Sequence, residues 1–353
     1  SSLEASPLDR SREPMGCRQS AAVAAGSGSA ATDLDSPDSL WAALAGRDVR
    51  LLRGSWLVAL AERGGVLPRR QECEEEAYID VPKLKAIYGS SDAKMMDGRK
   101  LTPVFAVSHA WRAKDHPDSG GETLCLLGRA LQERMPEYRR QGFADIGVFL
   151  DWSSLYQHPR SEAEEESFNR SLAWTSLWYG HARTTVFLAT DAAEGGVPYH
   201  ERGWTTFEFH LSWMAKDSDA GSAWPQVVDL SNLPWGRPPS AAPDAFFPGQ
   251  ALGDKTFADD SDRLKVARSF AQTCRDFFAG APSLDLRGTR CKDADAAGLG
   301  EVFKLCARLE ELDLRGQGAL TWLPDSLGQL GALKRLFLNS CVRLAALPES
   351  LGR

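Results

Sequence analysis

The stretch LTPVFAVS at residues 101–108 is nearly continuous in apolar residues and ends in a small polar side chain. Two runs of the same kind follow, IGVFLD at 146–151 and TTVFLAT at 184–190, and PQVVDL at 225–230 is a candidate for a fourth. Runs of this length are typical of strands that are buried on both faces of a parallel sheet. They predict the core of an α/β fold.

Helical patterns separate the predicted strands. Their apolar positions are Leu124, Leu127, Leu131, Phe168, Leu172 and Tyr179. Strand–helix–strand alternation of this kind predicts a flavodoxin-like parallel sheet with flanking helices.

Polar residues follow each predicted strand directly. Ser108 and His109 end the first, Asp151 ends the second, and Thr190 ends the third. In open parallel sheets the ligand crevice lies at the carboxyl ends of the strands, so we expect a site there. The histidines His109 and His116 are expected on the loop that follows and not as metal ligands, since no H-x-x-x-H spacing occurs.

The stretch YHERGWTTFE at residues 199–208 carries a carboxylate into an apolar helical stripe. The stripe has the i, i+3, i+7, i+10 pattern of one helix face and consists of Trp204, Phe207, Leu211 and Met214. Glu208 lies on the same face, four residues after Trp204. A buried charge is costly unless it is paired or used, which makes Glu208 the first candidate for function.

The rest of the chain divides by composition. Residues 1–38 are rich in Ser, Ala, Gly and Asp and predict a disordered tail. Residues 39–100 are expected to form a helical extension ahead of the α/β domain at 101–230. Residues 231–258 predict a linker that is rich in Pro and Gly, and 259–281 predict an amphipathic capping helix.

The tail contains Met15-Gly16-Cys17-Arg18-Gln19-Ser20. If Met15 is the start, this matches the N-myristoylation pattern at Gly16, with Cys17 beside it for palmitoylation, and two acyl chains would anchor the protein to a membrane surface. The alternative is a chance match inside a longer N-terminus.

Residues 282–353 contain an internal repeat. Nine positions from Leu309 to Gly328 recur 24 residues later, from Leu333 to Gly352, and an earlier copy begins at Leu284. A period of 24 residues with L-x-x-L-x-L is that of the leucine-rich repeat, so we expect a leucine-rich-repeat solenoid that recognises a ligand or a protein. The array is expected to continue beyond residue 353.

Composition excludes several classes of protein. The net charge of −7 argues against binding to nucleic acid, and no apolar run has the length of a membrane span. The seven cysteines are scattered without a C-x-x-C pair, which fits reduced thiols in the cytoplasm. No phosphate-binding loop or metal-ligand motif is present, so we expect no cofactor and no metal.

Three segments, in this order, resemble the heterokaryon-incompatibility (HET) domain, which is similar in fold to the Toll/interleukin-1 receptor (TIR) domain. They are VSHAW at 107–111, FLDWSSLYQ at 149–157 and RGWTTFE at 202–208. They correspond to an S-x-x-W-like strand end, a D-x-x-C-I-N-Q-like strand end and an R-x-W-x-x-x-E helix start. Tyr156 and the preceding serines replace the C-I-N of the HET pattern. The C-terminal repeats resemble those of plant resistance proteins.

The resemblance implies a signalling protein of immune type whose α/β domain cleaves NAD at the nicotinamide–ribose bond, as an NAD nucleosidase. Glu208 matches the catalytic glutamate of plant-type TIR domains. Six residues are expected to bind the substrate, namely Ser108, Trp111, Asp151, Trp152, Arg202 and Trp204.

Two alternatives remain open from the sequence. Glu208 either serves catalysis or is structural, bound to a backbone amide or paired with Arg202. Correspondingly, the α/β domain is either an enzyme or a scaffold that self-associates and binds protein partners without turnover. Convergence of the Ser108, Asp151 and Glu208 side chains on one open pocket would favour the enzyme, whereas a Glu208 sealed against Arg202 would favour the scaffold.

Overall fold

The computed structural model describes residues 33–92, 100–113, 115–191, 196–214, 216, 226–231, 251–287 and 291–351. Most of the predicted tail, including Gly16 and Cys17, lies outside these residues. So does most of the predicted linker.

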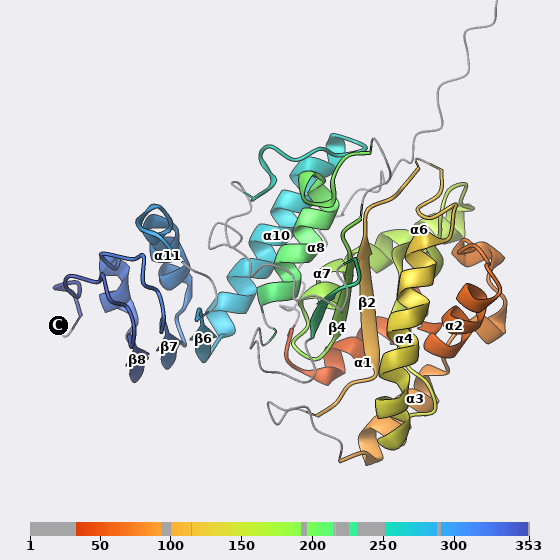
Figure 1. Cartoon of the computed structure of the whole chain (residues 1–353), viewed down its shortest axis with the longest axis horizontal. Helices are drawn as coiled ribbons and strands as arrows, with labels where there is room; N and C mark the ends of the chain where they lie inside the picture. Colours follow the sequence, from red (N-terminus) through yellow and green to blue (C-terminus); the bar gives the residue numbers. More distant parts are fainter. Residues whose placement is uncertain are drawn as a thin grey trace, which may run out of the picture.

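A five-stranded sheet forms the centre of the larger part of the molecule (Figure 1). Its strands, in spatial order, are β1 (Leu52–Arg53), β3 (Gly147–Phe149), β2 (Val104–His109), β4 (Thr185–Ala189) and β5 (Val227–Asp229). The last four run parallel, whereas β1 pairs with β3 in antiparallel orientation. The expected α/β fold is therefore confirmed, but the sheet is mixed and not wholly parallel.

The central strand β2 shows why these sequences form this sheet. All six of its residues are buried, as are all five residues of β4 beside it. Helices cover both faces, so side chains that alternate between the faces are all removed from water. Because β2 to β5 run parallel, their carboxyl ends lie at one edge of the sheet, and polar residues lie at these ends or just after them.

Helices α2 (Gly54–Glu62) and α4 (Glu122–Arg140) pack closely against each other. Their contact is close because Gly128 has no side chain there; a Cβ atom added to it would lie 2.6 Å from Cβ of Ala61. Helix α3 (Val81–Ser90) lies near the end of α4 (Figure 1).

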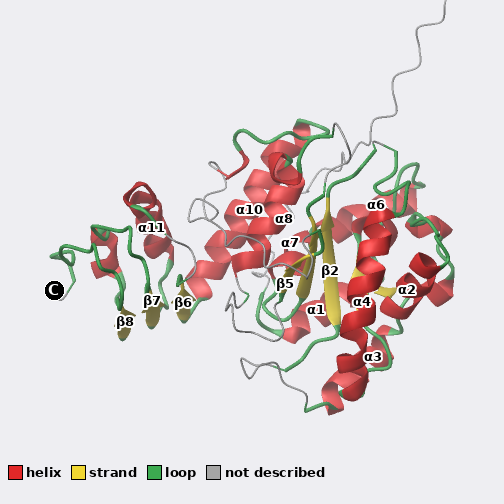
Figure 2. Cartoon of the chain, in the orientation of Figure 1, coloured by secondary structure: helices red, strands yellow, loops and turns green. Residues whose placement is uncertain are grey.

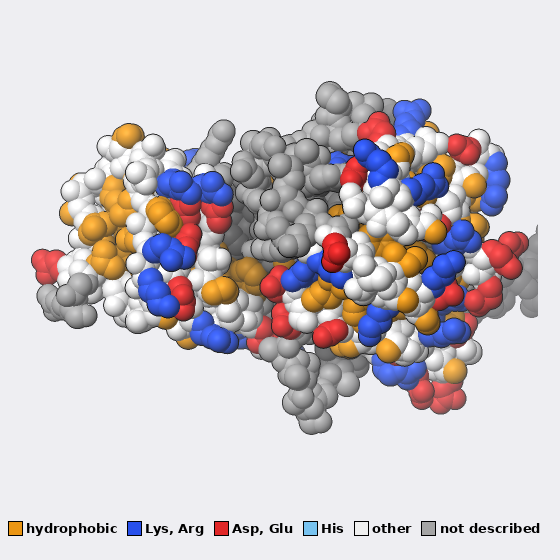
Figure 3. Space-filling view, turned by 90° about the horizontal axis from the view of Figure 1, so that it is seen from below, with side chains coloured by type: hydrophobic (Ala, Val, Ile, Leu, Met, Phe, Trp, Pro, Cys, Tyr) orange, Lys and Arg blue, Asp and Glu red, His pale blue; other side chains and the backbone are white. Residues whose placement is uncertain are grey.

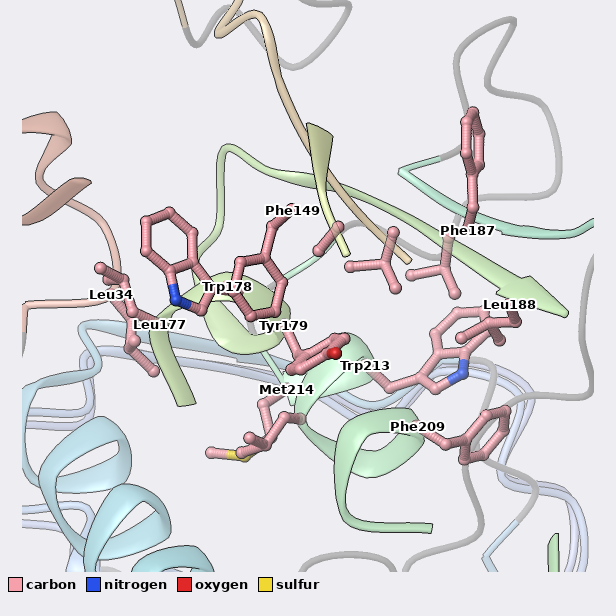
Figure 4. Close-up of a cluster of buried hydrophobic side chains, with 14 of the residues drawn as sticks. Leu34, Phe149, Leu177, Trp178, Tyr179, Phe187, Leu188, Phe209, Trp213 and Met214 are labelled. Carbon is pink, nitrogen blue, oxygen red and sulfur yellow. The ribbon is translucent and has the colours of Figure 1, made fainter. Parts of the chain in front are cut away.

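The other face of the sheet is covered by α7 (Thr175–Gly180) and α8 (Gly203–Met214), which contact β2 and each other. Figure 4 shows the apolar core there, with Trp178 of α7 beside Phe149 and Tyr179 of α7 near Trp213 and Met214 of α8. The rings of Phe149 and Trp178 are stacked, with centroids 5.0 Å apart. The short helices α5 (Asp151–Ser154) and α6 (Glu162–Leu172) connect β3 to α7.

The segment 39–100 is more than the helical extension that the sequence predicts. It contains α1 (Pro37–Ala45), α2 and α3, two turns of 3₁₀ helix (Arg70–Glu72 and Glu75–Ala77), and the edge strand β1. Leu52 of β1 is buried while Arg53 is exposed. A strand of two residues leaves no apolar run in the sequence, which is why the antiparallel edge was not predicted.

A second, three-stranded parallel sheet lies in the C-terminal part (Figure 2). Its strands are β6 (Ser283–Asp285), β7 (Glu311–Asp313) and β8 (Arg335–Phe337), with Leu284, Leu312 and Leu336 in register. Each strand falls in one copy of the sequence repeat. The connections contain α11 (Asp293–Leu305) and a 3₁₀ helix at Asp325–Gln329.

Helix α10 (Ser261–Gly280) joins the two parts. It is the helix expected at 259–281, and it packs against α7 and α8 on one side and α11 on the other. In the described part of the chain, no helix combines the length and the apolar character that crossing a membrane requires.

Candidate functional site

A chain of hydroxyl and carboxyl groups lies at the carboxyl end of β2. Ser108 Oγ donates to Oε2 of Glu208, with 2.5 Å between the two oxygens. The hydroxyl of Tyr199, from the short 3₁₀ helix Tyr199–Glu201, lies 2.5 Å from the same Ser108 Oγ. All three side chains are buried. The structure therefore brings Ser108 and Glu208 together through a direct hydrogen bond.

Tyr179 of α7 completes this chain of groups. Its hydroxyl donates to the carbonyl of Val107 over 3.3 Å, and its position near Glu208 acts to lower the pKa of that carboxyl group. Tyr199 and Ser108 form a chain of hydroxyl groups that ends at Oε2 of Glu208, where Ser108 is the donor. A carboxyl group buried among hydroxyl groups, with no cation bonded to it in the described residues, is less costly when it is protonated.

The electrostatics agree with a neutral Glu208. Burial raises the pKa of Glu208 well above its usual range, and the negative charge of Asp151 raises it further. The hydrogen bonds from Ser108 and Tyr179 act in the opposite direction but do not outweigh burial.

Asp151 lies in a contrasting environment at the end of β3. His109 Nε2 lies 3.0 Å from Asp151 Oδ1, Trp111 Nε1 donates to Oδ2 over 3.2 Å, and the Trp152 backbone amide donates to Oδ1 over 2.7 Å. Burial acts to raise the pKa of Asp151, but the charge of His109 and these hydrogen bonds lower it overall. The side chain is 23% exposed, so Asp151 is a carboxylate within reach of solvent.

His109 links the two groups along the chain, since it follows Ser108 directly. The expectation that it lies on a loop is wrong, because it is the last residue of β2 and its side chain is buried. Its Nδ1 atom has no hydrogen-bond partner among the described residues. No set of three or more metal-ligating side chains occurs in the described part of the chain.

Two of the tryptophans expected at the site lie beside Asp151. The rings of Trp111 and Trp152 meet edge to face, with centroids 5.3 Å apart. Trp152 is buried, and its Nε1 donates to the carbonyl of Leu67 over 3.1 Å. Trp111 is only partly buried, so of the two it is the ring that a ligand can reach.

Arg202 and Trp204 do not join this cluster. Arg202 Nε donates to the carbonyl of Val197 over 2.9 Å, and Trp204 Nε1 donates to Asp262 of α10 over 3.2 Å. The pairing of Arg202 with Glu208, one of the alternatives left open by the sequence, is not formed. The start of α8 packs against α10, and this draws the Trp204 indole away from the sheet although it is one helical turn from Glu208.

The sequence pattern gave no role to Tyr179 or Tyr199, or to a further carboxyl group at the sheet edge, that of Asp229. Tyr179 was taken as an apolar helix position, and Tyr199 lay in the quoted stretch without a role. Asp229 ends β5, where its Oδ1 accepts from Thr190 Oγ1 over 2.9 Å. The signal for Asp229 was present, since it is the last polar residue of the fourth apolar run.

Comparison with known proteins gave no match, whether with family models, with curated proteins or with solved structures.

Proposed function

We propose that the α/β domain binds NAD at the carboxyl edge of its sheet and cleaves the nicotinamide–ribose bond, as part of a signalling protein. The observation that carries the proposal is a pair of carboxyl groups in opposite environments: Glu208 of α8, which is bonded to Ser108 at the end of β2, and Asp151, which follows the neighbouring strand β3. Paired carboxyl groups with pKa values moved apart are a frequent arrangement for cleavage at an anomeric carbon.

The chemistry sets what the site has to provide. Nicotinamide carries a positive charge while it is bonded to ribose and leaves as a neutral molecule, so it needs no proton donor. Positive charge instead develops on the ribose ring, in an oxocarbenium-like transition state. An anionic group held near that ring in a partly desolvated site stabilises the transition state.

The C-terminal repeats are proposed to be leucine-rich repeats that recognise a protein partner. The face of their sheet bears rows of paired charges, with Arg287 next to Asp285 at 2.6 Å and Arg315 next to Asp313 at 2.5 Å. Figure 3 shows basic and acidic side chains side by side on this part of the surface. A face of this kind suits a polar partner surface of mixed charge more than a nucleic acid.

The direct test is release of nicotinamide from NAD by the purified full chain, followed by chromatography. Turnover that rises in proportion to protein concentration supports the proposal, and Trp204→Phe, whose indole lies against α10, serves as a matched control that keeps activity. Absence of nicotinamide release at high protein concentration contradicts it.

A non-enzymatic scaffold is the second candidate. Its supporting observation is that Glu208 is buried and accepts a hydrogen bond from Ser108 within the protein, as a structural residue would. The scaffold predicts self-association without turnover, and tolerance of substitutions at Asp151 as well as Glu208. Analytical ultracentrifugation next to the nicotinamide assay separates the two candidates.

A further inference from the structure

We propose that Asp151 is the catalytic residue of this site, as the anionic group that faces the developing charge, and that Glu208 is a positioning residue. This assignment rests on the proposed function and reverses the roles that the sequence resemblance implies. It follows from how each carboxyl group is bonded and how far each is exposed.

Glu208 is poorly placed to act on a ligand. Its Oε2 atom accepts from Ser108, and Tyr179 and Tyr199 are buried with it. Burial favours the neutral form of Glu208, and a neutral acid offers little to a developing cation. Glu208 instead holds the Ser108 side chain in place. It thereby holds the end of β2, where the next residue, His109, bonds to Asp151.

Asp151 has the opposite properties. Its Oδ1 atom accepts from His109 and from the Trp152 amide, and its Oδ2 atom accepts only from Trp111 in the described residues. An oxygen with one donor retains acceptor capacity for a ligand. The partly exposed side chain can therefore present a charged oxygen outward while three hydrogen bonds hold its orientation.

Trp111 offers an aromatic surface next to Asp151 Oδ2, on which the nicotinamide ring of a ligand can stack. Its indole is tied to Asp151 through Nε1 and is held edge-on against Trp152. An indole face beside a carboxylate is suited to a flat cation, because stacking and charge attraction act together. The positively charged nicotinamide ring of NAD has this chemistry, and free nicotinamide does not.

The cleavage of NAD balances with water as the other reactant. The bond between ribose C1′ and the nicotinamide nitrogen breaks, and its electron pair stays on the nitrogen, which becomes neutral. The ribosyl cation forms opposite the Asp151 carboxylate. Water adds to C1′ and loses a proton through Asp151 to solvent, which gives ADP-ribose, nicotinamide and one proton.

The first arm of the test is turnover of NAD by the full chain. Asp151→Asn keeps the shape and removes the charge, so kcat should fall on the order of 100-fold with a smaller change in KM. Glu208→Gln keeps a neutral donor and acceptor and should lose far less, whereas Glu208→Ala should lose more than Glu208→Gln. Asp262→Asn removes a buried carboxyl on α10 that bonds Trp204 and Lys265 outside this cluster, and it is the matched control. Circular dichroism confirms that each variant is folded.

The second arm does not depend on turnover. Binding of 1-methylnicotinamide, a cation that cannot be cleaved, is compared with binding of neutral nicotinamide by calorimetry. The wild type and Glu208→Gln should prefer the cation, and Asp151→Asn should lose that preference. If NAD is not cleaved but this pattern holds, the proposed activity fails and Asp151 stands as the anion of the site. Full activity or an unchanged cation preference in Asp151→Asn overturns the assignment.

Discussion

At the scale of single residues, the environment of Glu208 is the feature that needs explanation. A buried carboxylate without a cation is costly, and Arg202, the cation that the structural alternative would pair with it, is bonded to Val197. The hydroxyl groups of Ser108, Tyr179 and Tyr199 let the acid stay neutral and hydrogen-bonded. The same arrangement couples α7, α8 and the end of β2.

The protonation of Glu208 makes stability depend on pH. Its folded pKa is raised above the ordinary value of 4.5, so between these two values the folded chain keeps a proton that the unfolded chain releases. Stability should therefore fall as pH rises above 4.5, by up to about 1.4 kcal/mol per pH unit from this group. Nearby Asp151 is already ionised over most of that range. Chemical denaturation at several pH values should show this slope in the wild type and not in Glu208→Gln; parallel profiles would contradict it.

Residue identities alone indicated part of this site. Ser108 and Asp151 follow apolar runs, and the ends of parallel strands meet at one edge, so their approach was predictable. Tyr179 was not, because a tyrosine in an apolar stripe looks like any core residue until its hydroxyl is placed. The outward turn of Trp204 was not predictable either, because α10, almost 60 residues later, decides it.

At the scale of elements, the end of α7 is tied to the segment before α1 through His181. In the neutral ring, Nε2 donates to the Ser36 carbonyl and Nδ1 accepts from the Arg183 amide, each over 3.0 Å. Burial lowers the pKa of His181 to about 4, and the charges of Lys216 and Arg183 lower it too, against a raising effect of the Ser36 carbonyl and Asp35.

This histidine predicts a loss of stability in acid. The unfolded chain takes up a proton near pH 6.5 and the folded chain only near pH 4, so the stabilisation is complete above 6.5 and is lost as pH falls to about 4. The loss should be roughly 3 kcal/mol. His181→Gln keeps a donor for Ser36 and should flatten the profile in this window, as measured by urea denaturation. A variant as acid-sensitive as the wild type would rule out His181 as the source.

The elements themselves were predictable to the extent that they carry apolar runs. Strands β2 and β4 were found because all of their residues are buried. Strand β1 was not, because its pairing with β3 comes from backbone hydrogen bonds over only two residues. The mixed character of the sheet could therefore not be read from periodicity.

At the scale of the whole molecule, helix α10 packs against helices of both parts, the one with the five-stranded sheet and the one with the repeats. Phe270 of α10 packs edge to face on Phe207 of α8, with centroids 5.8 Å apart, while α10 also contacts α11. The 24-residue period predicted where the strands of the second sheet begin. It could not predict this junction, which depends on side chains from both parts.

Because the strands of successive repeats lie side by side, substitution of equivalent leucines should lower the free energy of unfolding by unequal amounts. Leu312 is fully buried between β6 and β8, whereas Leu336, its counterpart 24 residues later, is only partly buried. Leu312→Ala should lower the free energy of unfolding by about 2–5 kcal/mol, and Leu336→Ala by clearly less. Denaturation followed by circular dichroism measures both, and equal losses would show that the repeats do not support one another by stacking.

The central claim is that one edge of the sheet carries a neutral carboxyl group at Glu208 and an ionised one at Asp151. Infrared spectra of the full chain at pH 7, compared between wild type, Glu208→Gln and Asp151→Asn, test it directly. We expect a protonated carboxyl band that disappears only in Glu208→Gln, and a carboxylate band that is lost in Asp151→Asn. A protonated band that persists in Glu208→Gln but disappears in Asp151→Asn would contradict the account.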